Sequence, residues 1–136
     1  MLLRMGMVLM TLAGAASAEE TNIENGRYTY LYFCAECHGK DASGIGPIAE
    51  MMALEPPELT GLSDRNDGNF PTLYVAAQID GRSKAVGHGD MPIFGWSLES
   101  DKQVSIKLED GQTLMVTQHL AALLAYLESV QTKPSK

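Results

Sequence analysis

The sequence is poor in the residues from which several kinds of site are built. It has only two cysteines and three histidines in 136 residues, so a zinc site with four cysteine ligands is excluded. Lysine and arginine number 10 against 17 aspartates and glutamates, and the net charge is -7. An acidic chain of this kind disfavours binding to nucleic acid or to anionic lipid. Repeats and low-complexity segments are also absent from the sequence, and its length suits one small domain.

The one long apolar run lies at the start of the chain. Arg4 precedes an apolar stretch from Met5 to Ala16, and Ala16-Ser17-Ala18 precedes two glutamates. This pattern is typical of a secretory signal peptide with an A-x-A cleavage site, and the apolar core is short for a transmembrane helix. We therefore expect residues 1–18 to be a cleaved signal peptide, with an uncleaved anchor as the alternative. Residues 19–136 would then form one exported domain without stable membrane insertion.

Both cysteines belong to one short motif, Cys34-Ala35-Glu36-Cys37-His38. Two cysteines separated by two residues and followed at once by histidine are typical of covalent haem attachment. If the motif ends a helix, positions i, i+3 and i+4 share one face. Cys34 and Cys37 can then reach the two vinyl groups of a porphyrin while the imidazole of His38 reaches the iron. We therefore expect one haem c, attached through both cysteines, with His38 as an iron ligand.

Other interpretations of the two cysteines are weaker. A redox-active Cys-x-x-Cys is expected near a strand-helix-strand pattern, and none precedes Cys34. A zinc site would need His88 and His119 as further ligands, and these lack the short spacing of the usual zinc motifs. A disulfide between Cys34 and Cys37 would close a two-residue loop, which constrains the chain very little.

The sequence predicts a mainly helical fold with one β-hairpin. A helix is expected from Ile23 to about Phe33, with Asn22 as its cap, and Gly26 within it indicates close approach by another element. The last helix should follow a Thr117 cap, because apolar residues recur there at i, i+3, i+4 and i+7. The other expected elements are a short helix at 48–54 stopped by Pro56-Pro57, a helix from Pro71 to Asp80 ended by Gly81, and strands at 103–108 and 112–116 around a turn at 109–111.

An electron-transfer haem usually has methionine as its second iron ligand. Met91 is the best placed methionine, since it lies in Gly87-His88-Gly89-Asp90-Met91-Pro92, where glycines allow the backbone to approach a porphyrin and proline stiffens the chain. Methionines in helical or strand patterns more often fill gaps in the core. The rival ligands that remain open on the residues alone are Met51, Met52, Met115, His88 and His119.

The segment from Gly39 to Pro47 is rich in turn residues, and we expect it to wrap one edge of the haem. The carbonyl oxygen of Pro47 is free to accept a hydrogen bond from the second ring nitrogen of His38, which would fix the tautomer of a metal-bound imidazole. The alternative is an ordinary turn proline. Phe94, Trp96 and Tyr74 are candidates to line the haem pocket, or to be ordinary core residues.

Together these residues resemble a class I c-type cytochrome of the bacterial exported kind, over most of residues 19–136. Gly26 and Tyr30 resemble the glycine and aromatic positions of the family's first helix. Leu123 and Tyr126 resemble the corresponding pair on its last helix, where the two helices cross. The resemblance implies a cytochrome c fold with three main helices around one haem.

The same resemblance bears on the haem-binding residues. Gly46-Pro47 is similar to the family's loop proline that orients the haem histidine, and Met91-Pro92 is similar to its methionine ligand. The family likeness therefore implies that Pro47 contributes to haem binding and that His38 and Met91 are the iron ligands. Residues 97–117, which include the expected hairpin before the C-terminal helix, depart from the usual family pattern.

The implied function is that of a periplasmic monohaem electron carrier, and not of an enzyme. Its acidic surface would suit redox partners with a basic docking patch, or would simply keep an exported protein in solution. One alternative is a haem subunit of a larger dehydrogenase or oxidase, with the hairpin buried in an interface. Another is a haem with a labile sixth ligand that acts on peroxide or senses a small ligand.

Overall fold

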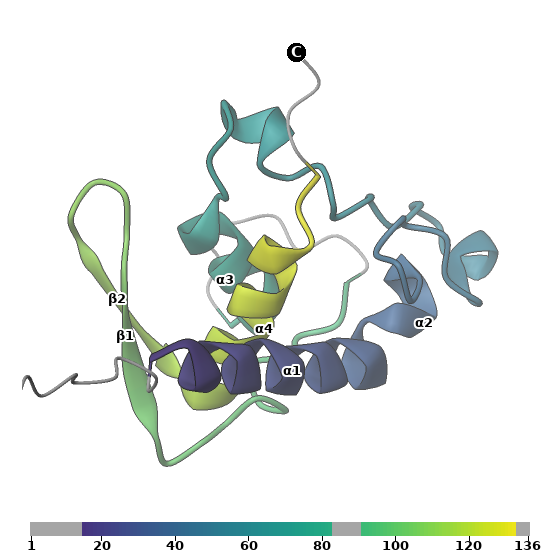
Figure 1. Ribbon diagram of the computed structural model, residues 1–136. Helices are drawn as coiled ribbons and strands as arrows, with labels where there is room; N and C mark the ends of the chain where they lie inside the picture. Colours follow the sequence, from purple (N-terminus) through teal and green to yellow (C-terminus); the bar gives the residue numbers. More distant parts are fainter. Residues whose placement is uncertain (1–14, 83–90, 133–136) are drawn as a thin grey trace, which may run out of the picture.

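The computed structural model describes residues 15–82 and 91–132, whose arrangement is drawn in Figure 1. These residues form four α-helices and one two-stranded antiparallel sheet, so the expected mainly helical chain with a hairpin is confirmed. None of these helices is both long and apolar enough to cross a membrane. The helices are α1 (Ala15–Phe33), α2 (Ala35–His38), α3 (Thr72–Asp80) and α4 (Gln118–Ser129), the single 3-10 turns are η1 (Ala49–Met51) and η2 (Asp64–Asn66), and the strands are β1 (Gln103–Lys107) and β2 (Thr113–Thr117).

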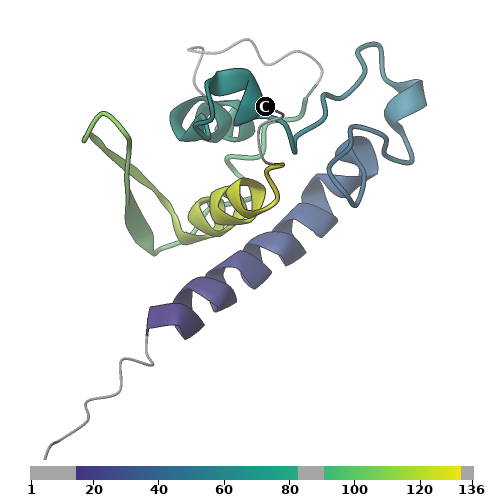
Figure 2. The same ribbon diagram turned by 45° about the horizontal axis from the view of Figure 1, so that its top comes forward.

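The centre of the fold is the contact between α1 and α4, which lie side by side in Figures 1 and 2. Gly26 of α1 lies where the backbones come closest. An ideal Cβ at this position would lie 2.6 Å from the carbonyl carbon of Ala122 and 2.8 Å from the Cβ of Tyr126. One turn later Tyr30 is completely buried, and its ring centroid is 5.3 Å from that of Tyr126. The close approach expected at Gly26 is therefore confirmed, and buried Leu123 packs in the same core.

The first helix is longer than the sequence predicted. α1 begins at Ala15, so Asn22 lies inside the helix and does not cap it. The reason is that residues 15–20 combine alanine and glutamate, which are strong helix formers, with no glycine or proline to interrupt them. Most of the predicted signal peptide, residues 1–14, lies outside the described residues, and its cleavage stays a prediction.

The short helix predicted at 48–54 is wrong. Only one 3-10 turn forms there, from Ala49 to Met51. The N–H of Ile48 donates to the carbonyl of Glu36 in another element, and Pro56 follows soon afterwards. Because proline disfavours helical backbone at the residue before it, the few residues that remain before Pro56 cannot repay the cost of nucleating an α-helix.

The two later helices agree with the local signals. α3 begins directly after Pro71 and ends at Asp80, where Gly81 follows with a left-handed φ of 66°. The hydroxyl oxygen of Thr117 accepts the N–H of Leu120 at 3.2 Å and so caps α4. Four leucines of the expected apolar stripe are buried in α4, namely Leu120, Leu123, Leu124 and Leu127. Its fifth member, Val130, lies just beyond the helix and is half-buried.

The predicted hairpin forms between α3 and α4 in the sequence. β1 and β2 pair with Val104 opposite Val116 and with Ile106 opposite Leu114, so these apolar side chains share one face. The open end of the hairpin is attached to the rest of the domain, because the Thr117 hydroxyl donates to the carbonyl of Leu98 at 2.7 Å. Figure 1 shows the other end of the hairpin extending away from the helices.

Candidate haem site

The two cysteines and the histidine lie on a single helical turn. α1 ends at Phe33, and α2 continues almost without interruption. The N–H of Cys34 donates to Tyr30, and the N–H groups of Cys37 and His38 both donate to the carbonyl of Cys34, at 3.2 and 2.9 Å. This backbone places the side chains of positions 34, 37 and 38 on one face. Both cysteines are free thiols and half-buried, as the expected attachment turn requires.

The turn is held from one side by the loop that follows it. N–H groups of this loop donate to three carbonyls of the turn: Gly44 to His38 at 2.8 Å, Gly46 to Cys37 at 3.0 Å and Ile48 to Glu36 at 3.1 Å. Carbonyls at the end of a helix have no partner within the helix, so such bonds stabilise the end. Backbone hydrogen bonds of this loop therefore help to fix the orientation of the turn.

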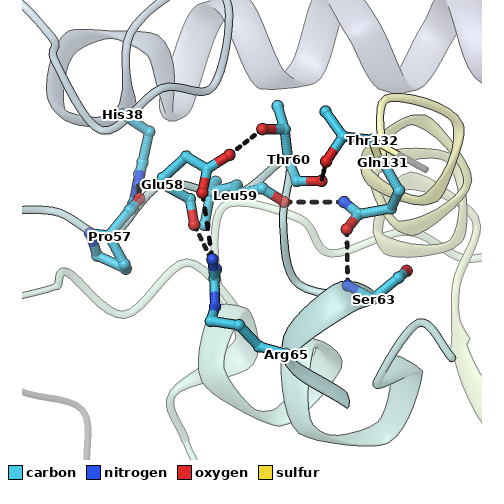
Figure 3. Close-up of polar contacts among 9 residues, drawn as sticks. All are labelled: His38, Pro57, Glu58, Leu59, Thr60, Ser63, Arg65, Gln131 and Thr132. Carbon is cyan, nitrogen blue, oxygen red and sulfur yellow. Dashed lines mark hydrogen bonds and ion pairs between the residues drawn. The ribbon is translucent and has the colours of Figure 1, made fainter. Parts of the chain in front are cut away.

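The imidazole of His38 is buried, and its orientation is set by Pro57 (Figure 3). The Nδ1 atom lies 3.0 Å from the carbonyl oxygen of Pro57, so the neutral ring donates its Nδ1 hydrogen there. Burial lowers the pKa of His38, and the bond to Pro57 opposes this in part. The Nε2 atom has no hydrogen-bond partner among the described residues. It therefore presents a lone pair that can bind a metal.

The expected hydrogen bond from His38 to Pro47 is wrong, because Pro57 takes that place. The loop around exposed Pro47 uses its N–H groups on the carbonyls of the attachment turn. The chain returns to the turn later, where the N–H of Leu59 donates to the carbonyl of Ala42 at 2.8 Å. Both prolines offer a free carbonyl, so composition could not separate them, and only the path of the returning chain decides which one reaches His38.

The segment that carries Pro57 is fixed by contacts from the end of the chain, as Figure 3 shows. The Gln131 side chain donates to the carbonyl of Leu59 at 2.8 Å and accepts the N–H of Ser63 at 2.9 Å. Arg65 binds both the carbonyl and the carboxylate of Glu58. Pro57 and Gln131 were not predicted from the sequence as parts of the site, and no local pattern marks Gln131.

The surroundings of Cys34 favour a neutral thiol. Burial, and then the nearby Cys37 thiol, raise the pKa of Cys34 to about 12. Reactive Cys-x-x-Cys pairs instead depend on a lowered thiol pKa. The raised pKa of Cys34 therefore disfavours the interpretation of the motif as a redox-active dithiol. Tyr30 closes the inner side of the turn, since its hydroxyl donates to the carbonyl of Gly39 at 2.7 Å.

Met91 is half-buried and packs against the hydrophobic core. Its sulfur lies 3.9 Å from the side-chain nitrogen of Gln78 on α3. Three residues later, the Phe94 ring packs edge-on against Phe33, with centroids 5.9 Å apart. Because Phe33 directly precedes Cys34, this contact links the Met91 segment to the end of α1 that carries the attachment turn.

Most of the rival iron ligands and of the expected pocket residues that the structure describes are exposed to solvent. Met115 is exposed on β2 and Met51 is exposed on η1, while His119 is exposed in the first turn of α4. His88 lies outside the described residues, so the alternative of a zinc site that uses His88 and His119 is not tested. Within 15–82 and 91–132, no three His, Cys, Asp or Glu side chains gather to hold a metal ion. Of the expected pocket residues, Phe94 is half-buried, whereas Tyr74 and Trp96 are exposed.

The donor groups at the turn fit a covalently bound haem. Two free thiols and an imidazole with a fixed tautomer and an unpartnered Nε2 lie on one face of one turn. A carbonyl that holds the other nitrogen of a metal-binding histidine is the usual outer support of such a ligand. Cys34, Cys37 and His38 are thus the residues that could hold haem and its iron.

Comparison with curated proteins and with solved structures found no match. A family model described as cytochrome c matches residues 23–131. The match begins in α1, includes the attachment turn and Met91, and ends just after α4, so it covers most of the chain. Members of this family bind haem and transfer electrons through it. The chain therefore belongs to the cytochrome c family.

Proposed function

We propose that this protein is an exported, class I monohaem cytochrome that carries single electrons between redox partners. The observation that carries the proposal is the arrangement at His38. The side chain shares a turn with both cysteines and has its Nδ1 held by Pro57, with Nε2 unpartnered. One haem is proposed because the sequence has two cysteines and therefore one attachment motif.

The proposed role of each cysteine is to anchor the haem covalently. Each thiol would form one thioether bond to a vinyl group of the haem, with the sulfur bound to carbon and the thiol hydrogen passed to the neighbouring carbon. This addition consumes no oxidant or reductant. Two such anchors on a turn held by three backbone hydrogen bonds leave the group little freedom to move.

His38 and Met91 are the proposed iron ligands. The bond from Nδ1 to the Pro57 carbonyl increases the electron donation of Nε2 and fixes the plane of the ring. The lowered pKa of His38 keeps the ring neutral and able to bind metal. When bound, haem iron supplies a one-electron couple whose potential depends on the axial ligands. If both His38 and Met91 bound the iron, no coordination site would remain for a substrate, which would suit an electron carrier.

Export and partner choice are supported by sequence features. Residues 1–18 have the pattern of a signal peptide, which supports export of the mature domain to a bacterial periplasm. The net charge of -7 favours encounter with a partner that has a basic docking patch. This attraction predicts electron-transfer rates that fall as salt is added.

The test is periplasmic expression of the full chain together with haem-maturation enzymes. We expect the purified protein to weigh one haem more than the polypeptide after signal cleavage, and to lose its covalent colour in the Cys34→Ala variant. In the wild type, the ferric spectrum should contain the weak long-wavelength band of methionine-ligated iron. This band should disappear in Met91→Ala and persist in the control Met115→Ala, which alters an exposed methionine on β2.

Two results would contradict the proposal. If the mature protein had only the mass of its polypeptide, no haem would be covalently attached and the proposal would be wrong. Rapid binding of carbon monoxide to the reduced wild type at neutral pH would show an open or labile sixth position, and would favour the peroxide-reacting or ligand-sensing alternative.

A further inference from the structure

Arg82, just beyond α3, gathers three side chains from two parts of the chain. Its Nε and Nη2 atoms bind the two carboxylate oxygens of Asp80 at 2.9 and 2.6 Å. Its Nη1 atom binds Glu99 at 2.6 Å. The guanidinium also lies over the ring of Trp96, 5.0 Å from its centroid. The planar fork of arginine can make all these contacts at once, and a lysine ammonium cannot.

These contacts join the chain before Met91 to the chain after it. Asp80 ends α3, while Trp96 and Glu99 follow Met91 by five and eight residues. The Arg82 side chain is about one third exposed and the Asp80 side chain one quarter exposed, so the geometry of several simultaneous contacts, more than burial, distinguishes the cluster from an ordinary surface ion pair.

Backbone contacts reinforce the same junction. The N–H of Phe94 donates to the carbonyl of Ile79 at 3.1 Å, and the N–H of Gly95 donates to that of Asp80 at 3.0 Å. The two backbones are so close that an ideal Cβ at Gly95 would lie 2.7 Å from the carbonyl oxygen of Asp80. Phe94 also contacts Phe33, beside the attachment turn. Position 94 is therefore a fixed point from which the chain reaches back to Met91 in three residues.

We propose that Arg82 is the positioning residue for Met91, through the cluster that it forms with Asp80, Trp96 and Glu99. This inference rests on the proposed role of Met91 as an iron ligand and adds the device that keeps the sulfur in place. The cluster holds the segment that follows Met91 against the end of α3. Loss of the guanidinium loosens that segment and raises the fraction of molecules in which the sulfur has left the iron.

An exogenous ligand measures that fraction directly. Imidazole can take the sixth position of ferric haem only in molecules where methionine has left, so its apparent affinity is proportional to the open fraction. In Arg82→Gln we expect imidazole to bind about tenfold more tightly than in the wild type, which corresponds to about 1.4 kcal/mol. Arg82→Lys, which keeps the charge without the fork, should bind with intermediate affinity.

The experiment titrates imidazole into the ferric holoproteins at one pH and salt concentration. The matched control is Arg27→Gln, which removes an exposed arginine paired with Glu24 on α1, away from this cluster. We expect the control to bind imidazole as the wild type does. Glu99→Gln removes one exposed carboxylate of the cluster and should shift the affinity in the same direction by a smaller factor, which keeps the test possible if Arg82→Gln does not fold.

The outcomes separate this inference from the proposed function. A wild type without the methionine band would refute the ligand assignment itself. With the band present in the wild type, equal imidazole affinities in Arg82→Gln, Arg27→Gln and the wild type would overturn the role of Arg82 alone. Equal affinities in Glu99→Gln and the wild type would do the same where only that variant folds.

Discussion

Replacing Gly26 by alanine tests how closely α1 and α4 must approach. In an exposed helix this change stabilises a protein by about 1 kcal/mol, because glycine is the poorer helix former. At this position the added Cβ would overlap the backbone carbonyl of Ala122 and lie 2.8 Å from the Cβ of Tyr126. Neither obstacle is the end of a flexible side chain, so the helices must separate.

Overpacking of a tight core costs about 1–3 kcal/mol and sometimes more. The Gly26 contact is at the severe end of that range because the obstacle is backbone. We therefore expect Gly26→Ala to lower the free energy of unfolding by about 2 kcal/mol, even after the gain in helix propensity. For a domain of this size the midpoint of thermal unfolding should fall by roughly 6–10 °C.

The assay is thermal unfolding of the holoprotein followed by far-ultraviolet circular dichroism. Asn25→Ala is the matched control, because Asn25 is the exposed neighbour of Gly26 on α1 and should tolerate alanine. If Gly26→Ala unfolded at or above the midpoint of Asn25→Ala, the close contact between the two helices would not limit stability and the reasoning would be refuted.

Three further changes have directions set by the structure. Thr117→Ala removes the cap of α4 and the bond to Leu98, and should lower the free energy of unfolding in urea by about 1–2 kcal/mol; a change below a few tenths would contradict this. Gln131→Met leaves the backbone groups of the Pro57 segment unpaired, and should cost about 1–3 kcal/mol in the same assay. A midpoint equal to that of the wild type would show that water replaces Gln131. The hydrogen bond from Arg82 lowers the pKa of Asp80, so Asp80 adds stability above its unfolded pKa of about 4 and loses it as pH falls through the lower folded pKa. Thermal unfolding of Asp80→Asn should therefore approach that of the wild type in acid, and parallel curves at all pH values would refute the linkage.

The predictions from sequence succeeded where a few neighbouring residues set the structure. The attachment turn needs only residues 34–38, because helical spacing alone brings the two thiols and the imidazole to one face. The Thr117 cap, Gly81 after α3 and the alternating strands around Glu109-Asp110-Gly111 are local in the same sense. Each depends on backbone geometry and hydrogen bonds within a few positions, so composition and spacing predict it.

The sequence was less informative where a stable helix depended on its surroundings. The pattern at 48–54 contains residues that can form a helix, yet only η1 appears, because Pro56 and Pro57 stop the segment before it is long enough to repay helix nucleation. α1 showed the opposite error. Asn22 has the side chain of a cap, but the alanine and glutamate residues before it continue the helix to Ala15.

By itself the sequence determined the Cys-x-x-Cys-His turn, the mainly helical pattern and the hairpin. Only the tertiary structure decided which carbonyl orients His38, because Pro57 lies 19 residues away and is placed by the returning chain. It also decided that Gln131 holds that segment from 72 residues away, and that Arg82 joins α3 to the chain after Met91. Such contacts depend on where distant backbones meet, and side-chain chemistry along the chain leaves several partners equally possible until packing selects one.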